Sequence, residues 1–387
     1  MQIALLGRQP GLSLAELERV FGDVSRFSQS TAVISSSKPV SIERLGGTQK
    51  AGAVVKELKS TNWSDAVKAI VDHYSQAWSD REGKITLGIS AYDFDVSPRE
   101  VQKVGLILKS KLKQRGVSLR LVPNQESTLS TATSHHNKLG LSDNKVELMV
   151  VRGRESIIVA ESTGAQNITA LAARDQGRPK RDAFVGMLPP KLAQIMINLA
   201  TKGIVGDKPV LDPFCGTGVV LQEALLMGHT AYGTDLAEKM VQFSSVNLKW
   251  LVEKYHLPHS WKVDEGDATK MSWEKPLGSV VCETYLGQPF SAPPSPKKLE
   301  EVRGNCQHII SQFLKNIHSQ LQPGTPLCIA VPAWRDSQGN FSRLPLVNQL
   351  GTFGYTPVEF KTAHPDELIY FRSDQVVARE ILVMIRK

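Results

Sequence analysis

The chain has 387 residues, of which 41% are hydrophobic and 22% are charged, as is typical of a globular protein with two or three domains. No apolar run approaches the ~18 residues of a membrane span, and the N-terminus lacks the basic region of a signal peptide. The four cysteines form no C-x-x-C pair, which argues against a zinc site and a disulfide framework. We therefore expect a cytoplasmic protein with no membrane segment and no metal.

The positive charge is unevenly distributed. The formal net charge is +8, and residues 1–185 carry 26 Lys and Arg against 19 Asp and Glu. The second half is close to neutral. A polyanion such as a nucleic acid would be attracted to the first half of the chain.

The first 60 residues predict a small α+β subdomain. Gln2–Leu6 and Thr31–Ser35 have the pattern of strands. Ser13, followed three residues later by Glu16, has the spacing of a capping box at the start of a helix. A second helix is predicted near Ala51–Leu58.

A second α+β region is predicted from residue 84 to about residue 170. Its strands are Lys84–Tyr92, Val117–Val122, Val146–Val151 and Ser156–Glu161, and Ser97 caps a helix that ends near Arg115. Six basic residues and no acid lie between residues 101 and 120. The basic face of this helix is a candidate surface for RNA phosphates, with Lys109, Lys113 and Arg115 as the predicted contacts.

A Gly-rich turn between two predicted strands is the strongest functional signal. Residues 212–218 read DPFCGTG after a short apolar strand, and an apolar helix follows. A P-loop would need Gly-Lys-Ser/Thr here, and a dinucleotide fingerprint would need a third glycine where Leu221 lies. Asp212 would repel a pyrophosphate but suits a ligand that carries an ammonium and a sulfonium. Asp235, at the end of the second strand, suits ribose hydroxyls.

This turn resembles motif I of S-adenosylmethionine (SAM) methyltransferases, in the form found in amino-methyltransferases that act on nucleic acid. The resemblance implies a doubly wound α/β, Rossmann-like class I domain. The implied cofactor residues are Asp212, Phe214, Gly216, Thr217, Gly218, Asp235 and Asp267. Asp267 is implied as the acceptor for the adenine amine.

The catalytic motif that the resemblance implies is altered. The family pattern is Asp-Pro-Pro-Tyr-Gly, whereas residues 283–287 read ETYLG. Glu283 takes the place of the acid, and Tyr285 lies one position before the tyrosine of the family. A carboxylate at this place would orient an exocyclic amine and assist its loss of a proton, and an aromatic ring would clamp the base.

Cys282 raises a second chemistry. A carbon-5 pyrimidine methyltransferase needs a thiolate nucleophile, and Cys282 adjoins the motif. It precedes the acid and lacks the expected proline–cysteine arrangement. A buried strand cysteine is the preferred interpretation.

The N-terminal half and the following segment resemble RNA-modifying enzymes. The segments GISAYDF, LSTATSHHNKL and VAESTGAQNI resemble a THUMP domain, an RNA-binding module of tRNA-modifying enzymes. Together with GRP, PPKLA and DPFCGTG, they resemble the archaeal and eukaryotic THUMP-containing tRNA guanine-N2 methyltransferases. Arg174, Arg178 and Lys180 are candidate RNA contacts.

The sequence therefore predicts four regions: an α+β subdomain (1–60), a THUMP-like RNA-binding domain (61–170), a linker (171–190) and a SAM-dependent methyltransferase domain (191–387). The predicted function is methyl transfer to the exocyclic amine of a flipped guanine in RNA, most simply tRNA. Two alternatives stay open. One is a non-catalytic RNA-binding protein with a degenerate methyltransferase domain, and the other is an amino-methyltransferase that acts on ribosomal RNA or DNA.

Overall fold

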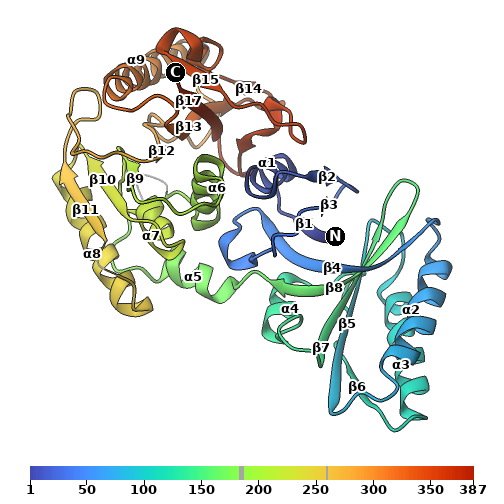
Figure 1. Cartoon of the computed structure of the whole chain (residues 1–387). Helices are drawn as coiled ribbons and strands as arrows, with labels where there is room; N and C mark the ends of the chain where they lie inside the picture. Colours follow the sequence, from blue (N-terminus) through green and yellow to red (C-terminus); the bar gives the residue numbers. More distant parts are fainter. Residues whose placement is uncertain (183–186, 259) are drawn as a thin grey trace. The chain divides into compact units, whose positions relative to one another are not determined.

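Two β-sheets organise the chain in the computed structural model, which describes residues 1–182, 187–258 and 260–387 (Figure 1). The first compact unit comprises Met1–Glu43 and Gly47–Ala170, and the second comprises Arg44–Gly46 and Leu171–Lys387. None of the helices in these described ranges combines the length and apolar character that crossing a bilayer requires.

The first unit is built on an eight-stranded sheet with the strand order β2-β3-β1-β4-β8-β7-β5-β6. Its strands are β1 Gln2–Leu6, β2 Val24–Arg26, β3 Thr31–Ile34, β4 Thr48–Leu58, β5 Lys84–Tyr92, β6 Ser118–Leu121, β7 Lys145–Arg152 and β8 Ile157–Ala165. Its helices are α1 Pro10–Phe21, α2 Trp63–Ala77, α3 Pro98–Lys113 and α4 Thr131–His136, with a 3-10 turn at Ile42–Arg44. The helix α5, Ile168–Gln176, leads into the second unit.

The strand β4 corrects one prediction. Ala51–Leu58, predicted as a helix, lies in this strand, which pairs antiparallel with β1 on one side and with β8 on the other. Pairing along both edges outweighs the helical preference of Ala, Lys, Glu and Leu. The same strand joins the two predicted regions 1–60 and 61–170 in one sheet.

Ser13 and Glu16 also have a different role from the one predicted. Both lie inside α1, whose first residue is Pro10. The Ser13 hydroxyl accepts a hydrogen bond from the Gly7 amide at 3.1 Å, and the Glu16 carboxylate accepts one from the Gly47 amide at 2.7 Å. The two polar side chains satisfy buried loop amides rather than the helix end.

The helices α2 and α3 lie side by side against the sheet of the first unit (Figure 1). The Ser97 side chain caps α3 and, with Glu100, forms a capping box. The apolar positions at helical spacing on α3, Val101, Val104, Leu108 and Leu112, are buried. The opposite face of α3 is left to its basic side chains.

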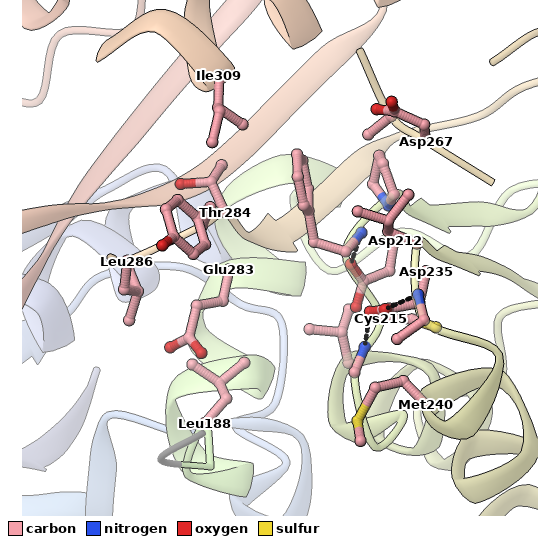
Figure 2. Close-up of a pocket in the computed structure, with 18 of the residues that line it drawn as sticks. Leu188, Asp212, Cys215, Asp235, Met240, Asp267, Glu283, Thr284, Leu286 and Ile309 are labelled. Carbon is pink, nitrogen blue, oxygen red and sulfur yellow. Dashed lines mark hydrogen bonds between the residues drawn. The ribbon is translucent and has the colours of Figure 1, made fainter. Parts of the chain in front are cut away.

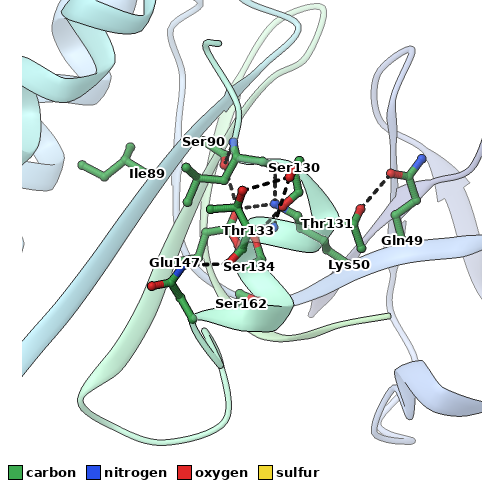
Figure 3. Close-up of polar contacts among 12 residues, drawn as sticks. Gln49, Lys50, Ile89, Ser90, Ser130, Thr131, Thr133, Ser134, Glu147 and Ser162 are labelled. Atoms are coloured by element: carbon green, nitrogen blue, oxygen red, sulfur yellow. Dashed lines mark hydrogen bonds and ion pairs between the residues drawn. The ribbon is translucent and has the colours of Figure 1, made fainter. Parts of the chain in front are cut away.

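A polar cluster is enclosed within the first unit (Figure 3). The Lys50 ammonium donates to the Glu147 carboxylate at 2.5 Å and to the Leu129 carbonyl at 2.7 Å. The Ser90 hydroxyl donates to the same carboxylate at 2.7 Å and accepts from the Leu129 amide at 2.9 Å. Lys50, Glu147 and Ser90 are fully buried, so these contacts fix the chain that enters α4.

The second unit is built on a mixed sheet, which has nine strands in the described residues and the main order β11-β10-β9-β12-β13-β17-β15. Its strands are β9 Val210–Asp212, β10 Ala231–Asp235, β11 Trp261–Glu265, β12 Val280–Glu283, β13 Pro326–Arg335, β14 Phe341–Ser342, β15 Tyr355–Pro357, β16 Ile369–Tyr370 and β17 Val377–Arg386. Its helices are α6 Pro190–Thr201, α7 Val219–Leu226, α8 Glu238–Tyr255 and α9 Pro296–His318, with 3-10 turns at Pro345–Phe353 and Pro365–Glu367.

The topology confirms the predicted doubly wound class. The strands from β11 to β13 are parallel, and β17 is antiparallel to β13 and β15. The chain order reverses at β9, because β10 and β11 lie on one side of it and β12 and β13 on the other. Ligands of open α/β sheets bind at the carboxyl ends of the strands beside such a reversal.

Candidate active site

A cavity of about 680 Å³ opens at the carboxyl ends of the strands β9, β10 and β12 (Figure 2). Figure 2 shows Glu283, Thr284 and Leu286 along one side, and Asp235 and Met240 along the other. Its described lining also includes Asp182, Leu188, Asp212, Gly216, Asp267, Tyr285, His308 and Gln312. The predicted catalytic residues and all but one of the predicted cofactor residues thus meet at one pocket; the exception is Gly218, which is not in the described lining.

The Gly-rich turn wraps one end of this cavity. Gly216 has φ of 50° and Gly218 has φ of 83°, values that favour glycine. The Gly216 amide donates to the Asp235 carboxylate at 2.9 Å, and the Ala237 amide donates to the other oxygen at 3.0 Å. Asp235 is therefore held by backbone amides at the end of β10, where a ribose could contact it.

Asp212 ends the strand β9 inside the domain and is 2% exposed. Its carboxylate accepts a hydrogen bond from the Phe214 amide at 3.1 Å. Burial raises its pKa well above the usual range, and the nearby Asp235 and Glu283 carboxylates add to this effect. A cationic ligand would relieve the cost of keeping this group ionised.

The charge of the lining fits such a ligand. Five acids line the cavity, and no Lys or Arg does so among the residues that the structure describes: Asp182, Asp212, Asp235, Asp267 and Glu283. This lining would repel a phosphate and attract an ammonium or a sulfonium. The residues present fit SAM.

Phe214 and Asp267 lie at the pocket as predicted, but each also has a structural contact. The Phe214 ring packs edge-on against Phe313 of α9, with 5.0 Å between the ring centroids. The Asp267 carboxylate accepts from both the amide and the hydroxyl of Thr269, at 2.9 and 2.6 Å. These bonds lower the pKa of Asp267, and its contact with adenine stays a prediction.

Glu283 ends the strand β12 and forms an ion pair with Arg379 of β17. The side chains are 17% and 8% exposed, so the pair is largely removed from water. Burial raises the pKa of Glu283, and the Arg379 guanidinium opposes this shift. Tyr285 lines the same pocket with 40% exposure, which leaves its ring accessible to a base.

Several lining residues were not predicted. Met240 comes from α8, and His308, Ile309 and Gln312 come from one face of α9. Their spacing at i, i+1 and i+4 on α9 is that of any amphipathic helix, so no specific pattern marks them in the sequence. Arg379 was also missed, because it lies in an apolar strand far along the chain.

The thiol of Cys282 does not support pyrimidine chemistry. Cys282 is fully buried in β12 and is not among the residues that line the cavity. Burial raises the pKa of its thiol well above the usual range, which opposes formation of a thiolate. Among the described residues, no group of three or more His, Cys, Asp or Glu could hold a metal ion.

The residues predicted to contact RNA fall into two sets. Lys109 and Lys113 are exposed near the C-terminal end of α3, Arg115 is exposed just after it, and Lys180 is also exposed. Lys180 lies over the ring of Phe243, with 5.6 Å from its ammonium to the centroid. These four remain candidates.

Arg174 and Arg178 are corrections, because both are buried. The Arg174 guanidinium donates to both oxygens of the Glu223 carboxylate, at 2.7 and 3.1 Å. Arg178 is 3% exposed and contacts the Met187 sulfur at 3.1 Å. Part of the predicted linker is therefore packed into the second unit, while residues 183–186 lie outside the described part.

Two methyltransferase family models match parts of this chain. A family model described as an RMKL-like methyltransferase domain matches residues 178–344. A DNA methylase model matches residues 62–246. With the fold and the acidic pocket, the match over residues 178–344 defines the second unit as a SAM-dependent methyltransferase domain.

Curated relatives identify the family of methyltransferases to which the chain is similar. A probable tRNA (guanine(10)-N2)-dimethyltransferase of Methanothermococcus thermolithotrophicus is 39% identical over 127 residues, which are 32% of this chain and 74% of that protein. The chain belongs to the tRNA guanine-N2 methyltransferase family. Proteins named tRNA (guanine(10)-N2)-dimethyltransferase from Methanothermobacter thermautotrophicus and Pyrococcus abyssi are 32% and 42% identical over 42% and 27% of this chain. The matches span only 44% and 26% of those two relatives.

Solved structures support the fold of the chain. TrmN from Thermus thermophilus aligns with a TM-score of 0.56 at 16% identity, over 100% of this chain and 99% of that one. The putative methyltransferase SMU.472, solved with SAH, aligns with a TM-score of 0.51 at 12% identity, over 100% and 98%. At these identities the likeness concerns the fold alone.

Proposed function

We propose that this chain transfers a methyl group from SAM to the exocyclic N2 amine of a guanine in tRNA. One observation carries the proposal: an acid-lined cavity at the sheet reversal holds Asp212 and Asp235 at one end and Glu283 with Tyr285 at the other. The family of the chain supports the choice of guanine and of tRNA. The names of the curated relatives make guanine 10 the first position to test.

Each part of the pocket has a role in the proposed reaction. SAM supplies an electrophilic methyl group on a sulfonium. Asp212 would attract the cationic methionyl part, and Asp235 would accept hydrogen bonds from the ribose. Phe214, Thr217 and Gly218 of the turn would shape the cofactor end, and Asp267 would accept from the adenine amine.

The substrate end would hold a base that has left its stack. The ring of Tyr285 would stack on the guanine, at the exposed mouth of the pocket. The Glu283 carboxylate would accept a hydrogen bond from the N2 amine, which directs the nitrogen lone pair to the methyl group. It would then assist the loss of the amine proton.

The first unit would supply affinity for RNA. The exposed end of α3 carries Lys109 and Lys113, Arg115 follows it, and Lys180 offers a further cation on the second unit. A THUMP-like role for residues 61–170 is part of this proposal. So is a cytoplasmic location, which the spacing of the four cysteines favours because it contains no C-x-x-C pair.

Methyl transfer to defined tRNA transcripts tests the proposal. Purified protein, SAM with a labelled methyl group and a transcript with guanine at position 10 should give N2-methylguanosine by nucleoside mass spectrometry. A matched transcript with inosine at that position, which lacks the N2 amine, should accept no methyl. The number of methyl groups on the product nucleoside, one or two, would give the extent of the reaction.

The same experiment separates the alternatives. Transfer to ribosomal RNA or DNA but not to tRNA would replace the proposed substrate. Binding of SAM and tRNA without transfer to any of these nucleic acids would favour the non-catalytic RNA-binding protein.

A further inference from the structure

The ion pair between Glu283 and Arg379 places a cation beside the acid of the proposed substrate end. The two residues are 96 positions apart in the sequence and lie on different strands, β12 and β17. Arg379 does not line the cavity itself, whereas Glu283 does. Arg379 therefore lies behind the acid rather than at the place of a ligand.

The register of the sheet explains how Arg379 reaches Glu283. Glu283 is opposite Ala330 of β13, and Ala330 is opposite Ile381 of β17. Arg379 is opposite Pro332, two residues further toward the carboxyl end of β13. Directly opposed residues share a face of the sheet, so Arg379 is on the same face as Glu283. The small side chain of Ala330 leaves room for the guanidinium between them.

Two hydrogen bonds of Thr284 fix the backbone after Glu283. The Thr284 amide donates to the Ala330 carbonyl at 3.0 Å, and the Thr284 hydroxyl donates to the same oxygen at 2.9 Å. Thr284 is 3% exposed. These bonds hold the backbone directly after β12, which lacks the prolines of the family pattern, but they do not involve the side chain of Glu283. Glutamate has one more rotatable bond than aspartate, and Arg379 restrains it.

We propose that Arg379 is a positioning residue for the Glu283 carboxylate, which it holds ionised and directed into the pocket for the substrate amine. The proposal rests on the proposed methyl transfer. Arg379 does not touch substrate or cofactor in this role, but acts through Glu283. One carboxylate oxygen binds the guanidinium, which leaves the other oxygen to accept the amine hydrogen.

The electrostatic surroundings of Glu283 make the role measurable. Asp212 on β9 is a second acid close enough to interact with it, and the Cys282 thiol precedes it on β12. In the described residues, Arg379 is the cation that opposes burial of Glu283. An opposite charge in direct contact favours the ionised form of a carboxyl and so lowers its pKa. Loss of Arg379 should therefore raise the pKa of Glu283 further.

The test compares Arg379→Met and Arg379→Lys by their pH–rate profiles under saturating SAM and tRNA. Activity requires the carboxylate, so it falls as the pH drops through the pKa of Glu283. The Met variant should move this acid limb upward by about one pH unit or more and lower kcat by about 10²-fold, with little change in the KM for SAM. The Lys variant keeps the charge but not the planar fork, so it should restore the acid limb and only part of kcat.

Arg343→Met is the matched control. Arg343 pairs with Glu380, the neighbour of Arg379 on β17, at 3.3 Å, and with Asp366 at 2.7 Å. It lines no part of the described pocket. This variant should keep the wild-type acid limb. An Arg379→Met enzyme with the wild-type limb and kcat would overturn the proposal.

A stability measurement keeps this inference separate from the proposed function. In Arg379→Met, the buried Glu283 carboxyl has no cation beside it and its pKa is raised further. The free energy of unfolding should therefore be highest at low pH, where this carboxyl is protonated, and should fall as the pH rises through the raised pKa. The double variant with Glu283→Gln should remove this loss. If the wild-type protein methylates no RNA yet the Arg379→Met variant and the double variant show this pattern, the reaction assignment fails while the ion-pair role stands. If tRNA is methylated and the pattern is absent, the positioning role fails alone.

Discussion

Asp212 is the residue best suited to bind a cation within the domain. Its carboxyl is buried, and burial raises its pKa, with Asp235 and Glu283 as further nearby acids. The surrounding protein thus works against ionisation of this group, and a bound sulfonium or ammonium would work in its favour. Cofactor binding and the charge of Asp212 should be linked.

We predict that Asp212→Asn lowers the affinity for SAM by about 10- to 100-fold, because the variant removes the charge that attracts the cationic cofactor. In wild-type protein, SAM affinity should rise with pH through the raised pKa of Asp212, and the Asn variant should not show this rise. Calorimetric titration from acidic to neutral pH measures both effects. Asp207→Asn is the control, since Asp207 is exposed and does not line the described pocket. An unchanged affinity in Asp212→Asn would remove Asp212 from the cofactor site.

At the scale of single elements, the helix α5 is anchored in the second unit by a buried ion pair. Arg174 is 8% exposed and Glu223 is 1% exposed. Removing one partner of such a pair leaves an uncompensated buried charge. We predict that Arg174→Met destabilises the protein by about 3–5 kcal/mol, measured by denaturant unfolding.

The double variant Arg174→Met with Glu223→Met should recover most of this stability, because two apolar side chains replace both charges. Lys180→Ala, at an exposed position of the same segment, should leave stability nearly unchanged. If Arg174→Met instead weakened RNA binding with full stability, the original assignment of Arg174 to RNA would be restored.

The exposed end of α3 gives a second prediction at the scale of single elements. We predict that Lys109→Ala with Lys113→Ala weakens tRNA binding and makes the dependence of log K on log salt less steep, by about 0.9 for each duplex phosphate that the protein no longer neutralises. Fluorescence anisotropy over a salt series measures the slope. Lys56→Ala with Lys59→Ala, also exposed but on and after β4, is the matched control. Equal slopes in the two double variants would exclude α3 as the phosphate-binding face.

Local sequence patterns correctly predicted those elements whose structure does not depend on pairing with distant strands. The helix after Ser97 followed from the predicted Ser97 cap and the apolar spacing, and the Gly-rich turn followed from DPFCGTG. Ala51–Leu58 failed because its strand state depends on partners at residues 2–6 and 157–165. Arg379 could not be predicted, because only the strand order brings it beside Glu283.

At the scale of the whole molecule, the chain has two compact units, and the described pocket is lined by residues of the second. A ligand stabilises only the structure that binds it, by about 2.7 kcal/mol at one hundred times its Kd. We predict that SAM slows amide hydrogen exchange in peptides that contain Asp212, Asp235 and Asp267, and leaves β5, β7 and β8 unchanged. Hydrogen-exchange mass spectrometry measures this. Equal protection in both units would show that the cofactor also acts on the first.

The ion pair of Glu283 and Arg379 can form only after a delay during synthesis of the chain. The two residues are separated by 96 positions. At roughly 5–20 residues per second, a ribosome needs about 5–20 s to add that length of chain. During this interval β12 has no strand β17 to complete its sheet, and Glu283 has no cation. The first unit can fold earlier, so under the proposed function the candidate RNA contacts of α3 would be in place before the chain acquires its proposed catalytic acid.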